Sequence, residues 1–195
     1  MDDLTIRPMS PDRWDDLVAL FGTRGDPAWC WCQFFVTTGQ GYSTDRASNQ
    51  ESLRAQVAAS ERPLGLLAYG GGVPIGWLAV GPLTSYDRLT SSRSLAAVRG
   101  DSDDENVWRT TCFVVKVGHR RRGVATALLR AAVDLARSHG ASAIEGHPID
   151  VEARTGKVGG SELFHGALST FVAAGFEEIG RTGPTRPVVR LPLDR

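Results

Sequence analysis

A short basic turn near the middle of the chain combines residue types that bind phosphate. It runs from His119 to Thr126 and contains three consecutive arginines followed by Gly123. Residues 107–117 are rich in β-branched and aromatic side chains and predict a buried strand, whereas apolar residues at helical spacing predict a helix over 123–138. The first N–H groups of a helix lack intrahelical partners and carry partial positive charge, and a glycine lets an anion approach them closely. The turn is therefore suited to holding a diphosphate.

The spacing of residues within the turn indicates which class of phosphate ligand it binds. The turn has neither the G-x-x-x-x-G-K-S/T of nucleoside triphosphate loops nor the G-x-G-x-x-G of dinucleotide-binding folds. It does contain Arg120-x-x-Gly123-x-Ala125 between a predicted strand and a predicted helix. This arrangement resembles motif A (Q/R-x-x-G-x-G/A) of the GNAT acetyltransferase superfamily. The resemblance implies that the diphosphate belongs to acetyl-CoA, which acts as co-substrate; the alternative is a helix start whose arginines are merely solvated.

The resemblance covers essentially the whole chain. The predicted element order matches the GNAT arrangement, and Ala174-Gly175-Phe176 resembles the A/L-G-F that follows the last helix of that superfamily. The segments Cys30–Cys32 and 145–150 resemble a group of actinobacterial-type GNAT proteins. The resemblance implies that the central strand contacts the thioester and pantetheine arm through its main chain and that the turn contacts the diphosphate. The expected cofactor-binding residues are Phe113, Val115, Val117, Arg120, Arg121, Arg122, Gly123, Val124, Ala125 and Thr126.

One position departs from the superfamily pattern. Many members have a tyrosine four residues before the glycine of the G-F pair, placed to protonate the leaving thiolate. This chain has Phe171 there, which cannot donate a proton. Another donor can act instead, with Ser169 or a bound water as candidates, or protonation is dispensable because a thiolate is already a good leaving group. The remaining alternative is a protein that binds acyl-CoA without turning it over.

Glu145 and His147 are candidates for the group that takes a proton from the attacking amine. They lie two residues apart in a predicted strand over 141–147, so their side chains share a face. A histidine has a reference pKa of about 6.5, which suits proton acceptance at neutral pH. The alternatives are a solvated histidine at a strand end and a glutamate held in a structural pair. The other histidines are assigned to the phosphate turn (His119) and to the surface (His139, His165).

The segment 29–35 carries the aromatic residues Trp29, Trp31, Phe34 and Phe35. So much aromatic surface is rarely left in water, since each ring buries a large apolar area. The segment predicts either a substrate-binding wall of an acceptor pocket or a part of the core. Its two cysteines have no second ligand pair at zinc-binding spacing, so no metal site is expected.

Strands and helices are predicted in alternation along the rest of the chain. Strands are expected at 4–8, 65–69, 73–80, 176–179 and 188–191. Helices are expected to begin after Ser10, after Ser48 as a capping box with Glu51, and after Ser161, and to end near Gly22, Ser60 and Gly175. The pattern predicts an α/β (α+β) fold: one GNAT-like domain over residues 1–195, with a mixed central sheet of about six to seven strands flanked by about four helices.

Residues 83–106 are polar and predict a loop. The loop includes the acidic tract 101–105, which is typical of a solvated segment. The alternative is an electrostatic funnel for a cationic amine acceptor.

Composition excludes several classes of partner. The 22 basic and 22 acidic residues cancel, so no overall field attracts nucleic acid or an anionic membrane. No apolar run approaches the ~18 residues of a membrane span, and the first residues do not resemble a signal peptide. Three cysteines cannot form a disulfide framework. We therefore expect a cytoplasmic protein with neither a nucleic-acid nor a membrane partner.

These features favour an enzyme of the acyltransferase class. The expected reaction moves an acetyl group from acetyl-CoA to a primary amine of a small molecule, by direct transfer in a ternary complex. The alternatives are a non-catalytic acyl-CoA-binding or sensing domain and an acetyltransferase that acts on a protein or an aminoacylated tRNA. Neutral net charge weakens the RNA alternative, because such a partner needs several phosphate contacts from basic residues. Paired protomers are common in the superfamily, so a homodimer is a further expectation.

Overall fold

One mixed sheet organises the molecule. The computed structural model describes residues 3–39, 42, 45–100, 106–156, 158–159 and 162–193. Seven strands in this part of the chain form a sheet in the order β1-β2-β3-β4-β5-β7-β6. Neighbouring strands are antiparallel except β4 and β5, which are parallel, so the predicted mixed sheet is confirmed. The strands are β1 (Leu4–Pro8), β2 (Gly65–Gly70), β3 (Val73–Pro82), β4 (Val107–Val115), β5 (Ala143–Gly146), β6 (Glu177–Gly183) and β7 (Arg186–Pro192).

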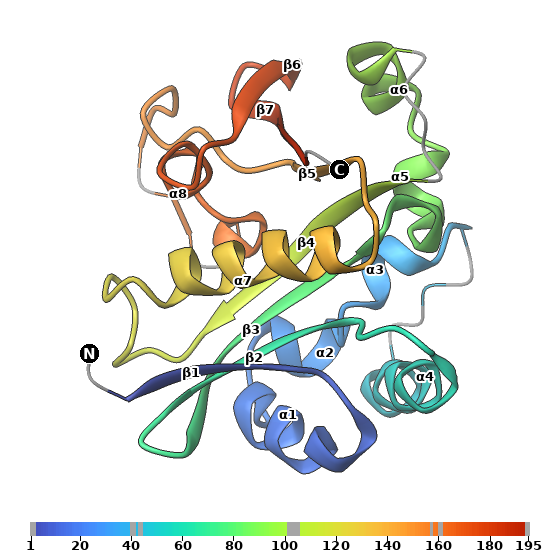
Figure 1. Ribbon diagram of the computed structural model, residues 1–195, viewed down its shortest axis with the longest axis vertical. Helices are drawn as coiled ribbons and strands as arrows, with labels where there is room; N and C mark the ends of the chain where they lie inside the picture. Colours follow the sequence, from blue (N-terminus) through green and yellow to red (C-terminus); the bar gives the residue numbers. More distant parts are fainter. Residues whose placement is uncertain are drawn as a thin grey trace.

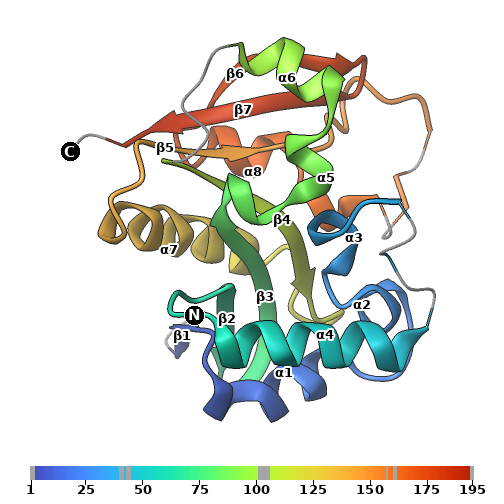
Figure 2. The same cartoon turned by 90° about the vertical axis from the view of Figure 1, so that its right-hand side faces the viewer.

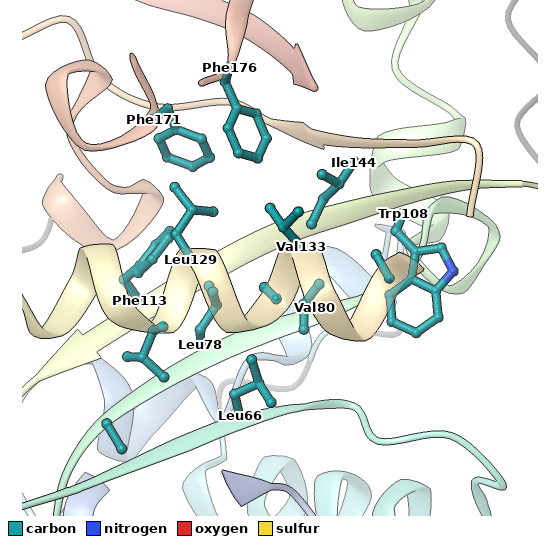
Figure 3. Close-up of a cluster of buried hydrophobic side chains, with 14 of the residues drawn as sticks. Leu66, Leu78, Val80, Trp108, Phe113, Leu129, Val133, Ile144, Phe171 and Phe176 are labelled. Atoms are coloured by element: carbon teal, nitrogen blue, oxygen red, sulfur yellow. The ribbon is translucent and has the colours of Figure 1, made fainter. Parts of the chain in front are cut away.

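Helices cover both faces of the sheet (Figure 1). Helix α7 (Val124–Ser138) crosses one face and buries an apolar stripe against β2, β3 and β4. Phe171 of the short helix α8 (Leu168–Val172) joins the same core beside Phe113 and Leu129 (Figure 3). Helices α1 (Trp14–Phe21) and α4 (Arg46–Ala59) pack on the opposite face around a second core. The sheet is thus covered on both sides, as its apolar strands require.

The region predicted as a loop at residues 83–106 contains helical structure. It forms the 3-10 turn η3 (Leu83–Ser85), helix α5 (Asp87–Thr90) and helix α6 (Arg93–Arg99). Ser92 caps α6 by accepting a hydrogen bond from the Leu95 N–H at 3.4 Å. These helices are too short to give a clear periodic pattern, so the prediction of a loop was wrong here. The acidic tract 101–105 lies outside the described residues.

The helix count exceeds the expected four for the same reason. The described residues contain eight α-helices, of which five have seven residues or fewer. The remaining short helices are α2 (Asp26–Cys30) and α3 (Gln33–Val36). Within the described ranges, no helix combines the length and hydrophobicity needed to cross a bilayer.

Two helix starts differ from their predictions. Helix α4 is capped by Asp45, whose carboxylate accepts from the Ser48 N–H at 2.8 Å, so the predicted cap at Ser48 was wrong by one turn. Ser161 lies outside the described residues. The helix predicted after it is a 3-10 turn, η4 (Leu163–His165), followed by α8, because Gly166 adopts a left-handed φ of 80° that interrupts the helix. Before α1, Pro11–Arg13 forms a further 3-10 turn, η1.

Candidate active site

The turn between β4 and α7 presents unpaired amides at a helix start. Gly123 is the N-cap of α7 with a left-handed φ of 78°, and its carbonyl accepts from the Ala127 N–H at 2.9 Å. The N–H groups of residues 124–126 precede this first intrahelical donor. The N-cap has no side-chain hydrogen bond, and the arginines of the turn are exposed. A 15-residue helix therefore directs free donors and its positive end toward an open basic turn.

The three arginines of the turn have different positions. Arg120 folds back on the strand, where its Nε donates to the Val115 carbonyl at 3.0 Å. Arg121 is exposed with a left-handed φ of 57°. Arg122 and His119 line a cavity of about 170 Å³ between the start of α7 and the β2–β3 turn. The assignment of His119 to a phosphate-binding turn stays a prediction.

The edge of β4 offers further main-chain donors. The Lys116 N–H donates to the Ile75 carbonyl of β3 at 2.9 Å. Because N–H groups alternate between the two edges of a strand, those of Phe113 and Val115 point to the opposite edge, toward β5. In the described residues, β5 pairs with β4 only from Val107 to Arg109, and the two strands then diverge (Figure 2). The N–H groups of Phe113 and Val115 thus lack a strand partner, whereas Val117 lies beyond the strand in the turn and is 74% exposed.

The Phe171 ring of α8 lies beside the place where β4 and β5 diverge. Phe171 is fully buried and lies 5.9 Å from the Phe113 ring in an edge-to-face contact. Its ring packs so closely on Gly146 that a Cβ there would come within 2.2 Å of the Phe171 Cε1. Ser169 is exposed and two residues away on the same short helix, so its hydroxyl points away from the Phe171 side. Its position gives no support to the predicted role as proton donor.

Glu145 is held in a buried ion-pair cluster. Its Oε2 accepts from Arg109 Nη1 at 2.7 Å and Arg99 Nε at 2.8 Å, and its Oε1 accepts from Arg190 Nε at 2.9 Å. The carboxylate is fully buried. Both carboxylate oxygens are occupied by hydrogen bonds from guanidinium groups and are closed to solvent, so neither is free to contact a reacting amine. This position corrects the expectation that Glu145 faces the reacting groups as a base.

A second cavity of about 320 Å³ lies on the face of the sheet away from α7. His147 follows β5 on this face, as the predicted two-residue spacing from Glu145 requires. Its Nε2 lies 2.7 Å from the Thr182 Oγ1. His165 of η4, predicted as a surface residue, is half-buried and lines the same cavity. The other lining residues include Phe35, Arg88, Leu89, Ser92 and Arg186.

Both cavity histidines are uncharged at neutral pH. Burial, followed by the charges of Arg109 and Arg186, lowers the pKa of His147 to about 4. Burial, followed by the charge of Arg186 and by the neighbouring His147, lowers the pKa of His165 to about 3. An uncharged imidazole can accept a proton, although at these pKa values it holds the proton weakly.

These lowered pKa values predict a pH-dependent stability. An unfolded histidine has a pKa near 6.5, so the unfolded chain binds more protons between that pH and about 4. The contribution to stability is complete above this window and is lost as the pH falls through it, by about 1–2 kcal/mol for each ring at pH 5. Urea unfolding at pH 7.5 and 5 should show a smaller loss in a His147→Gln/His165→Gln double variant. The exposed His139→Gln should behave as the parent; equal losses in all three proteins would contradict the prediction.

Some residues of the aromatic segment 29–35 belong to the core, whereas others lie at a cavity wall or at the surface. Trp31 is fully buried and stacks with Trp14 at 5.8 Å, so it belongs to the core and not to a substrate pocket. Phe35 lines the larger cavity. Phe34 is 38% exposed beneath the Arg88 guanidinium, which lies 4.3 Å from its ring centroid, and Trp29 is exposed. Phe35 is therefore the predicted substrate-binding aromatic that the structure places at a cavity wall.

Three cavity residues were missed as site residues by the sequence interpretation: Arg88, His165 and Arg186. They belong to α5, η4 and β7, which are far apart in the sequence, and none of them forms a motif. Only the fold brings them together. Among the described residues, no group of three or more His, Cys, Asp or Glu side chains is placed to hold a metal ion.

Comparison with known proteins decides the family. The profile of the acetyltransferase (GNAT) family matches residues 25–151, which is more than half of the chain. The chain belongs to the GNAT acetyltransferase family. The match covers the β4–α7 turn and both Glu145 and His147. No curated protein sequence matches the chain significantly.

Solved GNAT structures share the fold at low sequence identity. A GCN5-related N-acetyltransferase from Kribbella flavida is 18% identical, with 98% of this chain and 99% of that chain covered and a TM-score of 0.56. The yncA protein from Salmonella typhimurium, solved with its cofactor acetyl-CoA, is 13% identical over 98% and 95% of the two chains, with a TM-score of 0.56. The paia N-acetyltransferase from Thermoplasma acidophilum, in complex with coenzyme A, is 14% identical over 97% and 99%, with a TM-score of 0.56.

Proposed function

We propose that this GNAT protein transfers an acetyl group from acetyl-CoA to a primary amine of a small molecule, by direct transfer in a ternary complex. The observation that carries the proposal is the row of unpaired main-chain donors formed by the β4 edge and the α7 start. It begins at Phe113 and Val115 and continues through the left-handed Gly123 to Thr126. Two of the structural neighbours were solved with acetyl-CoA or coenzyme A, which supports the choice of co-substrate.

The donors suit two parts of acetyl-CoA, the diphosphate and the pantetheine arm with its thioester. The diphosphate would bind the amides of Val124, Ala125 and Thr126, with Arg121 and Arg122 adding positive charge. The N–H groups of Phe113 and Val115 would bind the pantetheine arm and the thioester. The cavity of about 170 Å³ beside Arg122 offers space for another part of the co-substrate.

The chemistry requires a neutral amine and a stabilised oxyanion. The amine nitrogen attacks the thioester carbonyl carbon, and the carbonyl oxygen becomes an oxyanion that a main-chain N–H can stabilise. The C–S bond then breaks, the amide forms, and the thiolate leaves as coenzyme A after taking a proton. His147 is our candidate to take the proton from the amine, because it is uncharged and faces the acceptor cavity. Phe171 cannot supply the proton to the thiolate, so water is our proposed source.

The size of the larger cavity supports a small-molecule acceptor. Its volume of about 320 Å³ fits a ligand of modest size, and Phe35, His147 and His165 form part of its wall. We propose the cytoplasm as the location, since Cys30, Cys32 and Cys112 are free thiols. A homodimer stays a prediction.

Thiol release from acetyl-CoA tests the proposed function. The purified protein should release coenzyme A faster with some members of a panel of primary amines than with buffer alone, and mass spectrometry should show the acetylated amine. Binding of acetyl-CoA with no amine-dependent release across the panel would contradict the proposal.

A second candidate function is acyl-CoA sensing without turnover, and Phe171 is the observation that favours it. A Phe171→Tyr variant separates the two functions. We expect the parent to turn over and the variant to change kcat by less than about tenfold, because a thiolate needs less help than a general acid usually gives. Phe176→Tyr is the control, since Phe176 is buried in the same core 5.1 Å from Phe171. Turnover in the Phe171→Tyr variant alone would favour sensing.

A further inference from the structure

We propose that the acceptor amine carries a carboxylate, which Arg186 binds in the cavity of about 320 Å³. This proposal rests on the proposed acetyltransferase function and names its substrate class: small amino acids. Helices α5 and α6 pass in front of β5 and β7 (Figure 2), and the residues that line the cavity include Leu89 of α5, Leu95 of α6 and Arg186 of β7.

Buried guanidinium donors in and behind the cavity have no hydrogen-bond partner in the described part of the protein. Arg186 lines the cavity, and its Nη1 is buried with no hydrogen-bond partner. Arg109 lies close enough to influence both cavity histidines, and its Nε and Nη2 are also buried without partners. A buried guanidinium N–H that loses water and gains no acceptor is costly, so such groups are normally satisfied by a ligand or by water. A carboxylate matches the planar fork of a guanidinium.

The charge around the cavity has the sign that an anion requires. Among the described residues, the cluster behind the cavity pairs one carboxylate, that of Glu145, with the guanidinium groups of Arg109 and Arg190 as well as that of Arg99. Arg186 and Arg88 add further positive charge at the wall. The described lining residues include no carboxylate. This field favours an anionic ligand and opposes a cationic one.

The same cavity offers a place for both ends of an amino acid. Arg186 and His147 both line it, so a small molecule can contact the guanidinium with its carboxylate while its amine lies near the imidazole. Holding the carboxylate would fix the orientation of the amine before attack. Arg186 thus has the position of a specificity-determining residue.

The experiment compares L-amino acids with their own carboxamides at saturating acetyl-CoA. The carboxamide has the less basic amine, because it lacks the neighbouring negative charge, so at pH 7 more of it is neutral and its intrinsic reactivity is favoured. We nevertheless expect kcat/KM to be at least about tenfold higher for the preferred acid than for its carboxamide, as a charge-assisted bond predicts. Faster turnover of carboxamides or of diamines would overturn the proposal while leaving the acetyltransferase function intact. Thiol release that no amine raises above the rate in buffer would instead overturn the proposed function.

Arg186 variants test the residue assignment. Arg186→Gln should lower kcat/KM for the acid by about 10–100-fold more than for its carboxamide, so the preference disappears. Arg137→Gln, an exposed arginine on α7, is the matched control and should keep the parent preference. If Arg186→Gln does not fold, Arg186→Lys keeps the charge without the fork and should reduce the preference partly. An unchanged acid-to-carboxamide ratio in a folded Arg186 variant would overturn the assignment.

Discussion

Replacing Gly123 with valine is expected to raise the dissociation constant of acetyl-CoA by about 10–100-fold, the loss expected when one or two charge-assisted hydrogen bonds are removed. Gly123 adopts a left-handed φ of 78° at the N-cap of α7. A β-branched residue disfavours this conformation, so the turn must shift and the amides of residues 124–126 move with it. Isothermal titration calorimetry with acetyl-CoA measures the effect directly.

Gly118→Val is the matched control for this substitution. Gly118 lies in the same exposed turn, its φ is outside the left-handed region, and a Cβ there would meet no atom within 4 Å. It should bind acetyl-CoA as the parent does. Equal affinity of the Gly123→Val and parent proteins would show that the start of α7 does not hold the co-substrate.

Glu145→Ala is expected to reduce the free energy of unfolding by about 3–5 kcal/mol, because it leaves three guanidinium groups without their shared carboxylate. Glu145 is fully buried, and each of its oxygens accepts from at least one of Arg99, Arg109 and Arg190. Urea unfolding at pH 7 measures the loss.

Two further variants separate the structural role of Glu145 from a role as base. Glu178→Ala removes an exposed ion pair with Arg181 and should cost less than about 1 kcal/mol. Glu145→Gln keeps the shape of the side chain but loses its charge, so it should also be less stable than the parent. A Glu145→Gln protein with parental stability and a large loss of kcat would instead assign Glu145 as the base.

The central part of the fold was predictable because its signals are local. The strand before the turn, the glycine at the helix start and the stripe of α7 are each encoded within about four residues, the range over which helix contacts act. The predicted helix over 123–138 agrees with α7 from Val124 to Ser138. The predicted strand over 107–117 agrees with β4 apart from its last two residues, where the chain enters the turn.

The errors have physical causes in the tertiary structure. The helices within 83–106 have four and seven residues, too few to show a period. Gly166 divides the predicted helix after Ser161 by adopting a left-handed conformation. The sequence does not show which rings of the aromatic segment are buried. Trp31 is buried and Trp29 is exposed because only one side of the segment packs against Trp14 and Trp77.

In the candidate site too, one half was predictable from local signals and the other depends on the tertiary structure. Its co-substrate half follows from one continuous motif around Gly123. Its acceptor half combines Arg88, His147, His165 and Arg186, whose only common property in the sequence is a polar side chain. Glu145 was selected by its spacing from His147, but spacing does not reveal the three arginines that the fold brings to it.

The most direct test of the account is a crystal structure of the protein grown with acetyl-CoA. We predict density for the diphosphate within hydrogen-bond distance of the N–H groups of Val124, Ala125 and Thr126, with the thioester beside Phe113 and Val115. Density for the nucleotide at another place, with the start of α7 filled by protein side chains, would contradict the account.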